Sequence, residues 1–195
     1  MFDGLIRPAT LRDATDLAAF VDMASEGIAS HFWSEMAEVG QSPSEVGRAR
    51  AMREDGSFSY RNAHIAEIDG AAAGALVGYP IDDPVDLSGI DQMGQFARDL
   101  TLLEAEAPGH WYVNVLATYP EYRGRGIGRA LLAQADKLGL AASAKGMSII
   151  VASENTGARR LYEKVGYKEK ASRPLVAFPG FKRGGAWVLL TKPCG

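Results

Sequence analysis

The chain has 195 residues, 47% of them hydrophobic and 23% charged, with a formal net charge of −3. This size supports a core that needs neither disulfides nor a metal, and we expect a single domain over residues 1–195. The slightly acidic balance argues against nucleic-acid binding through bulk positive charge, and with no signal peptide or membrane-length apolar run we expect a cytoplasmic protein without a membrane partner.

Hydrophobic periodicity and turn residues divide the first half of the chain into short elements. Apolar residues recur at helical spacing over residues 17–28. Ser42-Pro43 predicts the start of a second helix, and Asp69-Gly70 predicts a hairpin turn. The expected elements are a strand at 5–9, helices at 10–28 and 42–56, and strands at 63–68 and 71–79.

The second half alternates strands and helices. Residues 111–118 are rich in aromatic and β-branched side chains, which indicates a strand, and the apolar run at 147–153 is typical of a strand covered on both faces. The other expected elements are helices at 93–105, 128–144 and 156–165, and strands at 167–176 and 186–191. Only residues 111–153 require a parallel crossover, so we expect an α/β (α+β) fold with a mixed sheet and helices on both faces.

The most informative segment is a glycine-rich loop that follows a strand and opens a helix. It reads Arg123, Gly124, Arg125, Gly126, Ile127, Gly128, Arg129. Glycines let the backbone approach a ligand, so several N–H groups can converge on one anion at the positive end of the helix dipole. The alternative is a solvated basic turn. The loop lacks the Lys-Ser/Thr of a Walker motif, and both registers of a dinucleotide fingerprint lack the last glycine.

At these residues the sequence resembles the GNAT N-acetyltransferase superfamily. The family's cofactor motif, Arg/Gln-x-x-Gly-x-Gly/Ala, is met by Arg123, Gly126 and Gly128. Residues 155–167 are similar to its second signature, and residues 6–14 resemble its first strand and helix. The resemblance implies a mostly antiparallel sheet with splayed central strands. It also implies acetyl-CoA as co-substrate and acetyl transfer to a primary amine of a small molecule or peptide.

The resemblance further implies where acetyl-CoA binds. A splay between the strands that end at Thr118 and Ser153 leaves backbone groups of residues 116–118 for the amides of the pantetheine arm. These groups belong to Leu116, Ala117 and Thr118. The loop at 123–129 then holds the pyrophosphate. Asn155 is placed to bond the arm, and its alternative role is the N-cap of the helix that starts at the next residue.

Tyr162 occupies the position of the catalytic tyrosine in the family's second signature. The resemblance therefore implies that its phenol protonates the departing CoA thiolate, a general-acid step. The alternative is a core aromatic whose hydroxyl meets water. A backbone N–H near Leu116 is expected to stabilise the carbonyl oxygen as charge develops.

The sequence does not single out a general base. Glu104 and Glu106 precede the strand that faces the acceptor, and either carboxylate is a candidate base acting through water. His110 is another candidate, and a water chain would need no dedicated base. Strand alternation puts Tyr112 and Asn114 on one face of that strand.

The acceptor itself is not readable from the sequence. Residues 82–106 contain seven acidic residues and one basic residue, which would attract an ammonium group or would simply form a solvated face. The resemblance implies that the cluster His31-Phe32-Trp33 lies where the family often builds its acceptor pocket, and the alternative is ordinary core packing.

Two other functions stay open. One is a CoA-binding regulatory module without catalysis. The other is a nicotinamide or flavin enzyme, against which the missing glycine counts. We expect no metal, because the three histidines lack ligand-like spacing, and the single Cys194 fits a reducing compartment. Pairing of the last two strands across a homodimer is left open.

Overall fold

The computed structural model describes residues 2–176 and 184–194. The chain forms two compact units, the first made of Met1–Gly78 and Val115–Gln134 and the second of Tyr79–Asn114 and Ala135–Gly195. β3 (Ala71–Pro80), β4 (Trp111–Thr118) and α5 (Ile127–Ala141) each run from one unit into the other. The prediction of a single domain stays a prediction. Among the described residues, no helix has the length and apolar character needed to cross a membrane.

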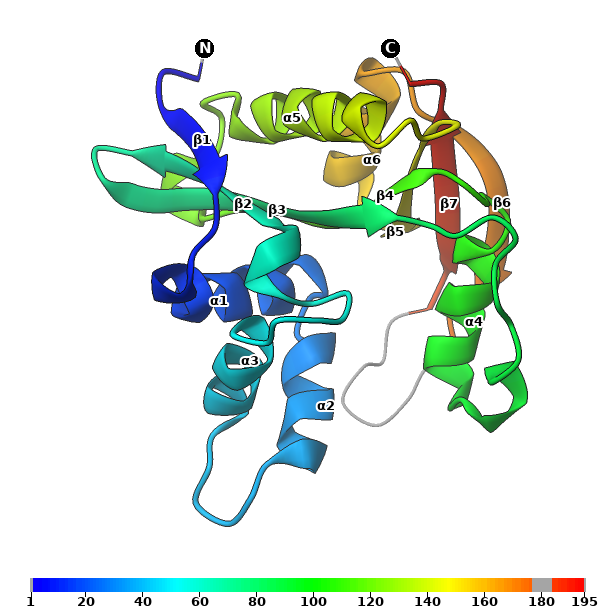
Figure 1. The fold of residues 1–195 in the computed structure, drawn as a ribbon, viewed down its shortest axis with the longest axis horizontal. Helices are drawn as coiled ribbons and strands as arrows, with labels where there is room; N and C mark the ends of the chain where they lie inside the picture. Colours follow the sequence, from blue (N-terminus) through cyan, green and yellow to red (C-terminus); the bar gives the residue numbers. More distant parts are fainter. Residues whose placement is uncertain (1, 177–183, 195) are drawn as a thin grey trace. The chain divides into compact units, whose positions relative to one another are not determined.

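Seven strands pair in the order β1-β2-β3-β4-β5-β7-β6 (Figure 1). The pairs β1–β2, β2–β3, β5–β7 and β7–β6 are antiparallel, whereas β4 and β5 are parallel. The predicted mixed, mostly antiparallel sheet is therefore confirmed. The turn between β2 and β3 has two residues with positive φ, Asp69 at 50° and Gly70 at 80°, as the hairpin signal predicted.

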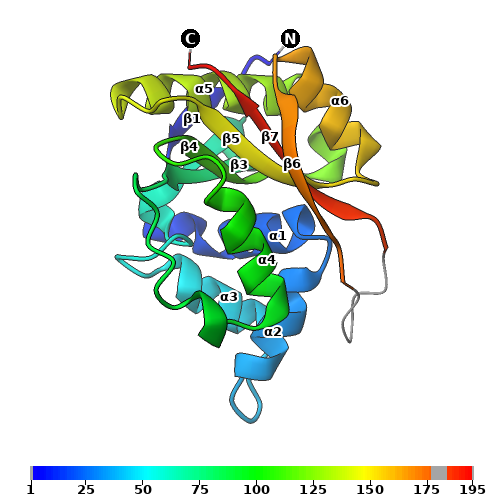
Figure 2. The ribbon, with the colours of Figure 1, turned by 90° about the vertical axis from the view of Figure 1, so that its right-hand side faces the viewer.

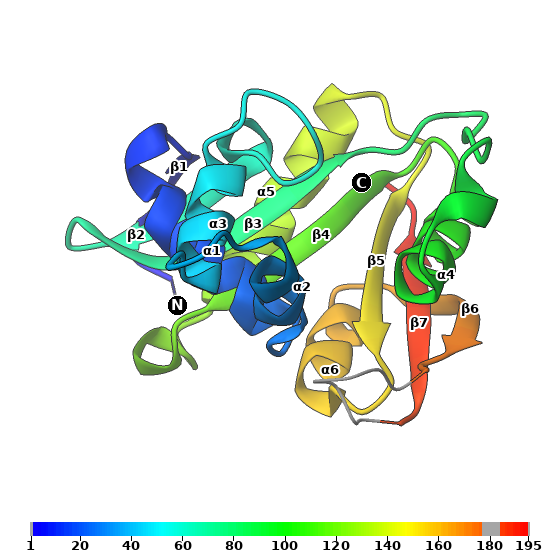
Figure 3. The ribbon, with the colours of Figure 1, turned by 90° about the horizontal axis from the view of Figure 1, so that it is seen from below.

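The first unit consists of the strands of one half of the sheet and three helices that pack against one another (Figure 3). Its elements, besides parts of β3, β4 and α5, are β1 (Leu5–Pro8), α1 (Ala14–Ala24), α2 (Ile28–Met36), α3 (Pro43–Ala51) and β2 (Ala63–Ile68). Leu17 and Phe20 of α1 pack on Ile65 and Ala75. Gly74 lies on the opposite face of β3, where its backbone approaches Ile127 of α5. Helices thus cover both faces of this part of the sheet.

The helix α2 was not predicted from the sequence. Ile28 was assigned to the first helix on its spacing, but α1 ends at Ala24. Glu26 and Gly27 have φ of 55° and 90°, a left-handed conformation that no α-helix can continue through. The chain then restarts as α2 at Ile28. The predicted helix at 10–28 is therefore wrong beyond Ala24, and α3 also ends at Ala51 rather than near residue 56.

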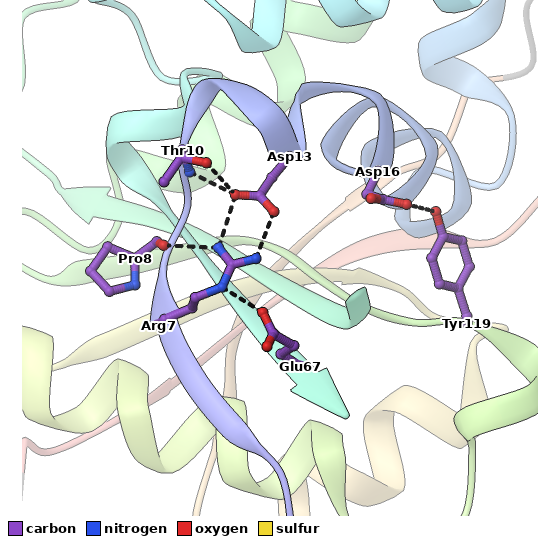
Figure 4. A network of polar contacts seen from close by, with 7 residues as sticks. All are labelled: Arg7, Pro8, Thr10, Asp13, Asp16, Glu67 and Tyr119. Carbon is purple, nitrogen blue, oxygen red and sulfur yellow. Dashed lines mark hydrogen bonds and ion pairs between the residues drawn. The ribbon is translucent and has the colours of Figure 1, made fainter. Parts of the chain in front are cut away.

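A buried carboxylate ties the start of α1 to the edge of the sheet (Figure 4). Asp13, 6% exposed, accepts from Arg7 Nη2 at 2.8 Å and from the Thr10 backbone N–H at 2.7 Å. The Arg7 Nε donates to Glu67 at 2.7 Å. Burial raises the pKa of Asp13, but the hydrogen bonds from Arg7 and Thr10 outweigh it, so that its pKa lies below the ordinary value.

We expect Asp13→Ala to lower the free energy of unfolding by about 2–4 kcal/mol, because it removes the acceptor of the Thr10 N–H and leaves the Arg7 charge without its main partner. Denaturant unfolding measures this, and Asp55→Ala, at an exposed carboxylate, is the control. A carboxyl with a depressed pKa stabilises the fold above its unfolded pKa and loses that contribution as the pH falls through its folded pKa. The difference between wild type and Asp13→Ala should therefore shrink at acidic pH; a difference below 0.5 kcal/mol at neutral pH, about the size of an ordinary surface substitution, would contradict the assignment.

The second unit contains the strands of the other half of the sheet, and a helix covers each face of these strands. Its further elements are α4 (Gln95–Glu104), β5 (Met147–Ala152), α6 (Thr156–Lys164), β6 (Lys168–Pro174) and β7 (Ala186–Lys192). α4 packs across β5, β7 and β6 (Figure 2), with Leu103 against Leu189 and Ile150. On the opposite face, Gly139 of α5 lies against Met147. The predicted cover of both faces is confirmed here as well.

The strand β6 forms one edge of the sheet and pairs only with β7. Lys168 and Lys170 are exposed on it, and the register shifts between Glu169 and Ala171. Pro174 closes the strand without a backbone donor. Charged side chains, a bulge and a proline are the features that edge strands commonly carry.

Candidate active site

The glycine-rich loop lies in the first unit, between β4 and α5. Gly124 and Gly126 have φ of 77° and 84°, which favour glycine. The first amide of this stretch with a backbone partner is that of Ala130, which donates to the Gly126 carbonyl at 3.0 Å. The N–H groups of residues 124–129 donate to no carbonyl of the described chain. The loop thus presents a run of unpaired N–H groups at a helix N-terminus, which is the geometry that anion binding requires.

The arginines of the loop differ in their surroundings. Arg123 Nε lies 3.3 Å from the Thr118 carbonyl oxygen, to which it donates. Arg125 lies 3.6 Å from Asp3 in an ion pair. Arg129 is exposed on the first turn of α5. The positive charge of Arg125 is thus partly balanced by Asp3, and Arg129 stays open to solvent.

The segment before the loop is anchored to α1 in the same unit. The hydroxyl of Tyr119 donates to Asp16 at 2.8 Å (Figure 4), and its ring lies 4.3 Å from that of Phe20. Burial and the hydrogen bond to Asp16 raise the pKa of Tyr119 well above its usual value, so the phenol stays a donor. This contact fixes the exit of β4 against a rigid helix.

The ladder between β4 and β5 is short. It pairs Trp111–Val113 with Met147–Ile149, although β4 continues to Thr118 and β5 to Ala152. Beyond Val113 no residue of β4 has a described pairing partner in β5, and this includes the predicted pantetheine contacts at 116–118. A pantetheine contact at Leu116, Ala117 and Thr118 therefore stays a prediction.

Tyr162 lies in the second unit, on α6. It is 5% exposed, and its ring centroid lies 6.1 Å from that of Tyr167. Burial raises the pKa of Tyr162 well above that of a free phenol. The hydroxyl therefore keeps its proton at neutral pH, as a general acid requires before it donates.

Glu104, at the C-terminal end of α4, is the carboxylate of this unit whose surroundings are unusual. Burial raises its pKa to about 7. Its side chain makes no ion pair with any described residue. The nearby Tyr112 is 5% exposed, and its pKa is raised by burial and by the charges of Glu104, Tyr79 and Tyr162. These three residues therefore act electrostatically on the Tyr112 hydroxyl.

Two further polar groups join Tyr112. Asn114 donates from Nδ2 to the Tyr79 hydroxyl at 2.8 Å, and the Tyr79 ring meets the Tyr112 ring edge-on at 5.6 Å. Asn114 is exposed and follows directly after the last β4 residue that pairs with β5. The second unit thus gathers a titratable carboxyl, three phenols and an amide around the point where the ladder ends.

Comparison with known families identifies the fold. The family described as "Acetyltransferase (GNAT) family" matches residues 26–167, more than half of the chain. The chain belongs to this family. The predicted family and the predicted acyltransferase class are thereby confirmed. A search among curated proteins gave no match.

Solved structures share this GNAT fold along nearly the whole chain. An acetyltransferase structure is 22% identical with a TM-score of 0.65, covering 98% of this chain and 100% of its own. An N-acetyltransferase from Staphylococcus aureus Mu50 is 18% identical with a TM-score of 0.66, covering 96% and 100%. The yncA protein of Salmonella typhimurium, solved with its cofactor acetyl-CoA, is 16% identical with a TM-score of 0.63, covering 98% and 94%.

The remaining predicted residues of the GNAT site take different positions. Glu106 is exposed, two residues beyond the end of α4. The His110 Nδ1 lies 3.3 Å from the Pro108 carbonyl oxygen. Asn155 Oδ1 accepts from the Ala158 N–H at 3.1 Å, so this residue is the N-cap of α6. The capping role proposed as the alternative is present, and a contact with the cofactor stays a prediction.

Ion pairs within the second unit partly neutralise the acidic segment at residues 82–106. Asp83 pairs with Lys145, Asp91 with Arg98 at 3.1 Å, and Asp99 with Arg173 at 3.9 Å. These pairs are surface contacts of small energetic weight. They reduce the negative field that the sequence alone suggested for attracting an ammonium group.

Sequence reasoning missed Tyr79, which contacts both Asn114 and Tyr112. It lies at the end of a hairpin strand, 35 residues from its partner Asn114, and carries no motif. The only signal was the polar Asn114 inside a strand of otherwise apolar and aromatic residues, which indicates that a partner exists without naming it.

Proposed function

We propose that this GNAT protein transfers an acetyl group from acetyl-CoA directly to a primary amine of a small molecule or peptide. The observation that carries the proposal is the run of unpaired N–H groups at 124–129, which suits the pyrophosphate of coenzyme A. The short ladder of β4 supports a pantetheine site at Leu116, Ala117 and Thr118.

In this mechanism, Glu104 removes a proton from the acceptor ammonium, directly or through water. A carboxyl with a pKa near 7 is matched to that task at neutral pH. The neutral amine then attacks the thioester carbonyl, and a backbone N–H near Leu116 stabilises the oxygen. Tyr162 donates its phenolic proton to the departing sulfur, and the proton that the new amide nitrogen loses restores the phenol directly or through water. Glu106 is the second carboxylate considered, and its side chain is exposed to solvent.

An acetyl-CoA consumption assay across amine classes tests the proposal, with calorimetry of coenzyme A binding beside it. Turnover on at least one primary amine together with saturable binding is the expected result. Binding without turnover on any amine would favour the regulatory module. Retention of NADH or FMN without coenzyme A binding would favour a nicotinamide or flavin enzyme.

We expect Glu104→Gln to lower kcat/KM for the acceptor by about 10²-fold, the usual contribution of a general base. Because only the ionised carboxyl accepts a proton, wild-type kcat/KM should rise as the pH increases through about 7, and the variant should lack this rise. The measurement is a pH–rate profile of both proteins with the same amine. Glu106→Gln is measured in parallel, and a larger loss there would transfer the role to Glu106.

A further inference from the structure

A buried polar cluster lies in the second unit, on the side of the sheet that carries α5. Lys192 Nζ contacts Asp136 Oδ2 at 2.7 Å, and the Lys192 side chain is only 8% exposed. The same ammonium lies 5.1 Å from the centre of the Tyr167 ring. The cluster therefore joins α5, β7 and the residue that precedes β6.

Two polar atoms of this cluster are buried without a hydrogen-bond partner among the described residues. They are the hydroxyl of Tyr167 and the second carboxylate oxygen, Oδ1, of Asp136. Tyr167 is 2% exposed, so neither bulk water nor a surface group reaches it. Buried polar groups are nearly always paired, and neighbouring unpaired ones are commonly joined by an internal water.

Tyr167 is also connected to Tyr162. Its backbone N–H donates to the Tyr162 carbonyl at 3.1 Å, and the two rings lie 6.1 Å apart at 58°. Burial raises the pKa of Tyr167, and the charges of Asp136, Tyr162 and Cys194 add to this shift. The Lys192 ammonium, which contacts Asp136 and lies over the Tyr167 ring, joins both to the pair of tyrosine rings.

We propose that Tyr167 and Asp136 hold one buried water, and that this water, with Lys192, fixes the Tyr167 ring as the surface that positions Tyr162 for proton donation. The proposal rests on the acid role of Tyr162 proposed above. Asp136 Oδ1 accepts a hydrogen bond from the water, and the Tyr167 hydroxyl donates a hydrogen bond to the water oxygen. Tyr167 acts as a positioning residue and contacts no substrate.

The water is tested by the stability of Tyr167→Phe, which removes only the hydroxyl. An unpartnered buried hydroxyl costs stability, so its removal would leave Tm unchanged or raise it. A hydroxyl bound to the water contributes stability, so Tm should fall by about 2–4 °C. Asp136→Asn should then lower Tm less in the Tyr167→Phe protein than in wild type. An unchanged or raised Tm, or additive effects, would overturn the water.

Positioning is tested by turnover. Tyr167→Phe should lower kcat by about tenfold or more at unchanged KM for acetyl-CoA, as a displaced catalytic group does. In a Tyr162→Phe background the same change should have no further effect. Equal losses in both backgrounds would overturn the positioning role while leaving Tyr162 as the acid. If Tyr162→Phe alone keeps full turnover, the acid role and the positioning role both fail, and the Tm result still decides on the water. Tyr60→Phe, at a hydroxyl bonded to Glu54 in the first unit, is the control.

Discussion

Tyr162→Phe is expected to lower kcat by about 10²–10⁴-fold, the range for loss of a general acid. The phenol is the group assigned to protonate the departing thiolate, and its burial keeps it protonated at neutral pH. The ring that packs near Tyr167 is retained, so the affinity for acetyl-CoA should change by less than about threefold, less than 0.7 kcal/mol of binding energy. Steady-state kinetics and calorimetry with coenzyme A measure the two quantities.

The control for Tyr162→Phe is a tyrosine whose hydroxyl forms its hydrogen bond outside the candidate site. Tyr60→Phe removes a hydroxyl that donates to Glu54 at 2.8 Å in the first unit and should leave kcat unchanged. Equal kcat for Tyr162→Phe and wild type would exclude the acid role. A parallel loss of coenzyme A affinity would instead indicate that Tyr162 supports the binding site.

Gly126→Val is expected to weaken coenzyme A binding by about 100-fold or more, equivalent to 2.7 kcal/mol. Gly126 has a φ of 84°, where a β-branched residue is strained by about 1–3 kcal/mol, and it lies among the unpaired amides of the loop. The new side chain would stand where the pyrophosphate is expected to meet those amides. Calorimetric titration with coenzyme A measures the affinity, and a thermal melt measures the cost to the fold.

Backbone strain alone has to be separated from loss of the site. Gly70 has a φ of 80° in the hairpin between β2 and β3, with open space around it. Gly70→Val should therefore lose similar stability but bind coenzyme A as wild type does. If both variants bind equally well, the loop at 123–129 does not hold the cofactor.

Local signals predicted most of the fold. The strand at 111–118 and the hairpin around Gly70 have the expected bounds, because β-branched runs and left-handed turn residues act over a few positions. The helical spacing of apolar residues wrongly extended the first helix to Ile28, because this local pattern does not reveal a break between two helices. A glycine at position 27 ends one helix and begins another without disturbing the apolar spacing.

Motifs give the sequence its candidate site residues, whereas contacts that depend on packing leave no motif. The loop and Tyr162 lie within the two signatures. The choice between Glu104 and Glu106 depends on tertiary packing around the end of α4, which leaves Glu104 half-buried and Glu106 exposed. Pairs such as Asp136–Lys192, 56 residues apart, have no local signal at all.

The outer strand β6 has a consequence for the protein at high concentration. Another chain can pair with an edge strand only where successive backbone N–H and C=O groups are regularly spaced. In β6 the register shift after Glu169 and the missing N–H of Pro174 interrupt this spacing. Ammonium groups at Lys168 and Lys170 would also repel an identical strand. Strand-by-strand self-association through β6 is therefore disfavoured, even in dense solutions.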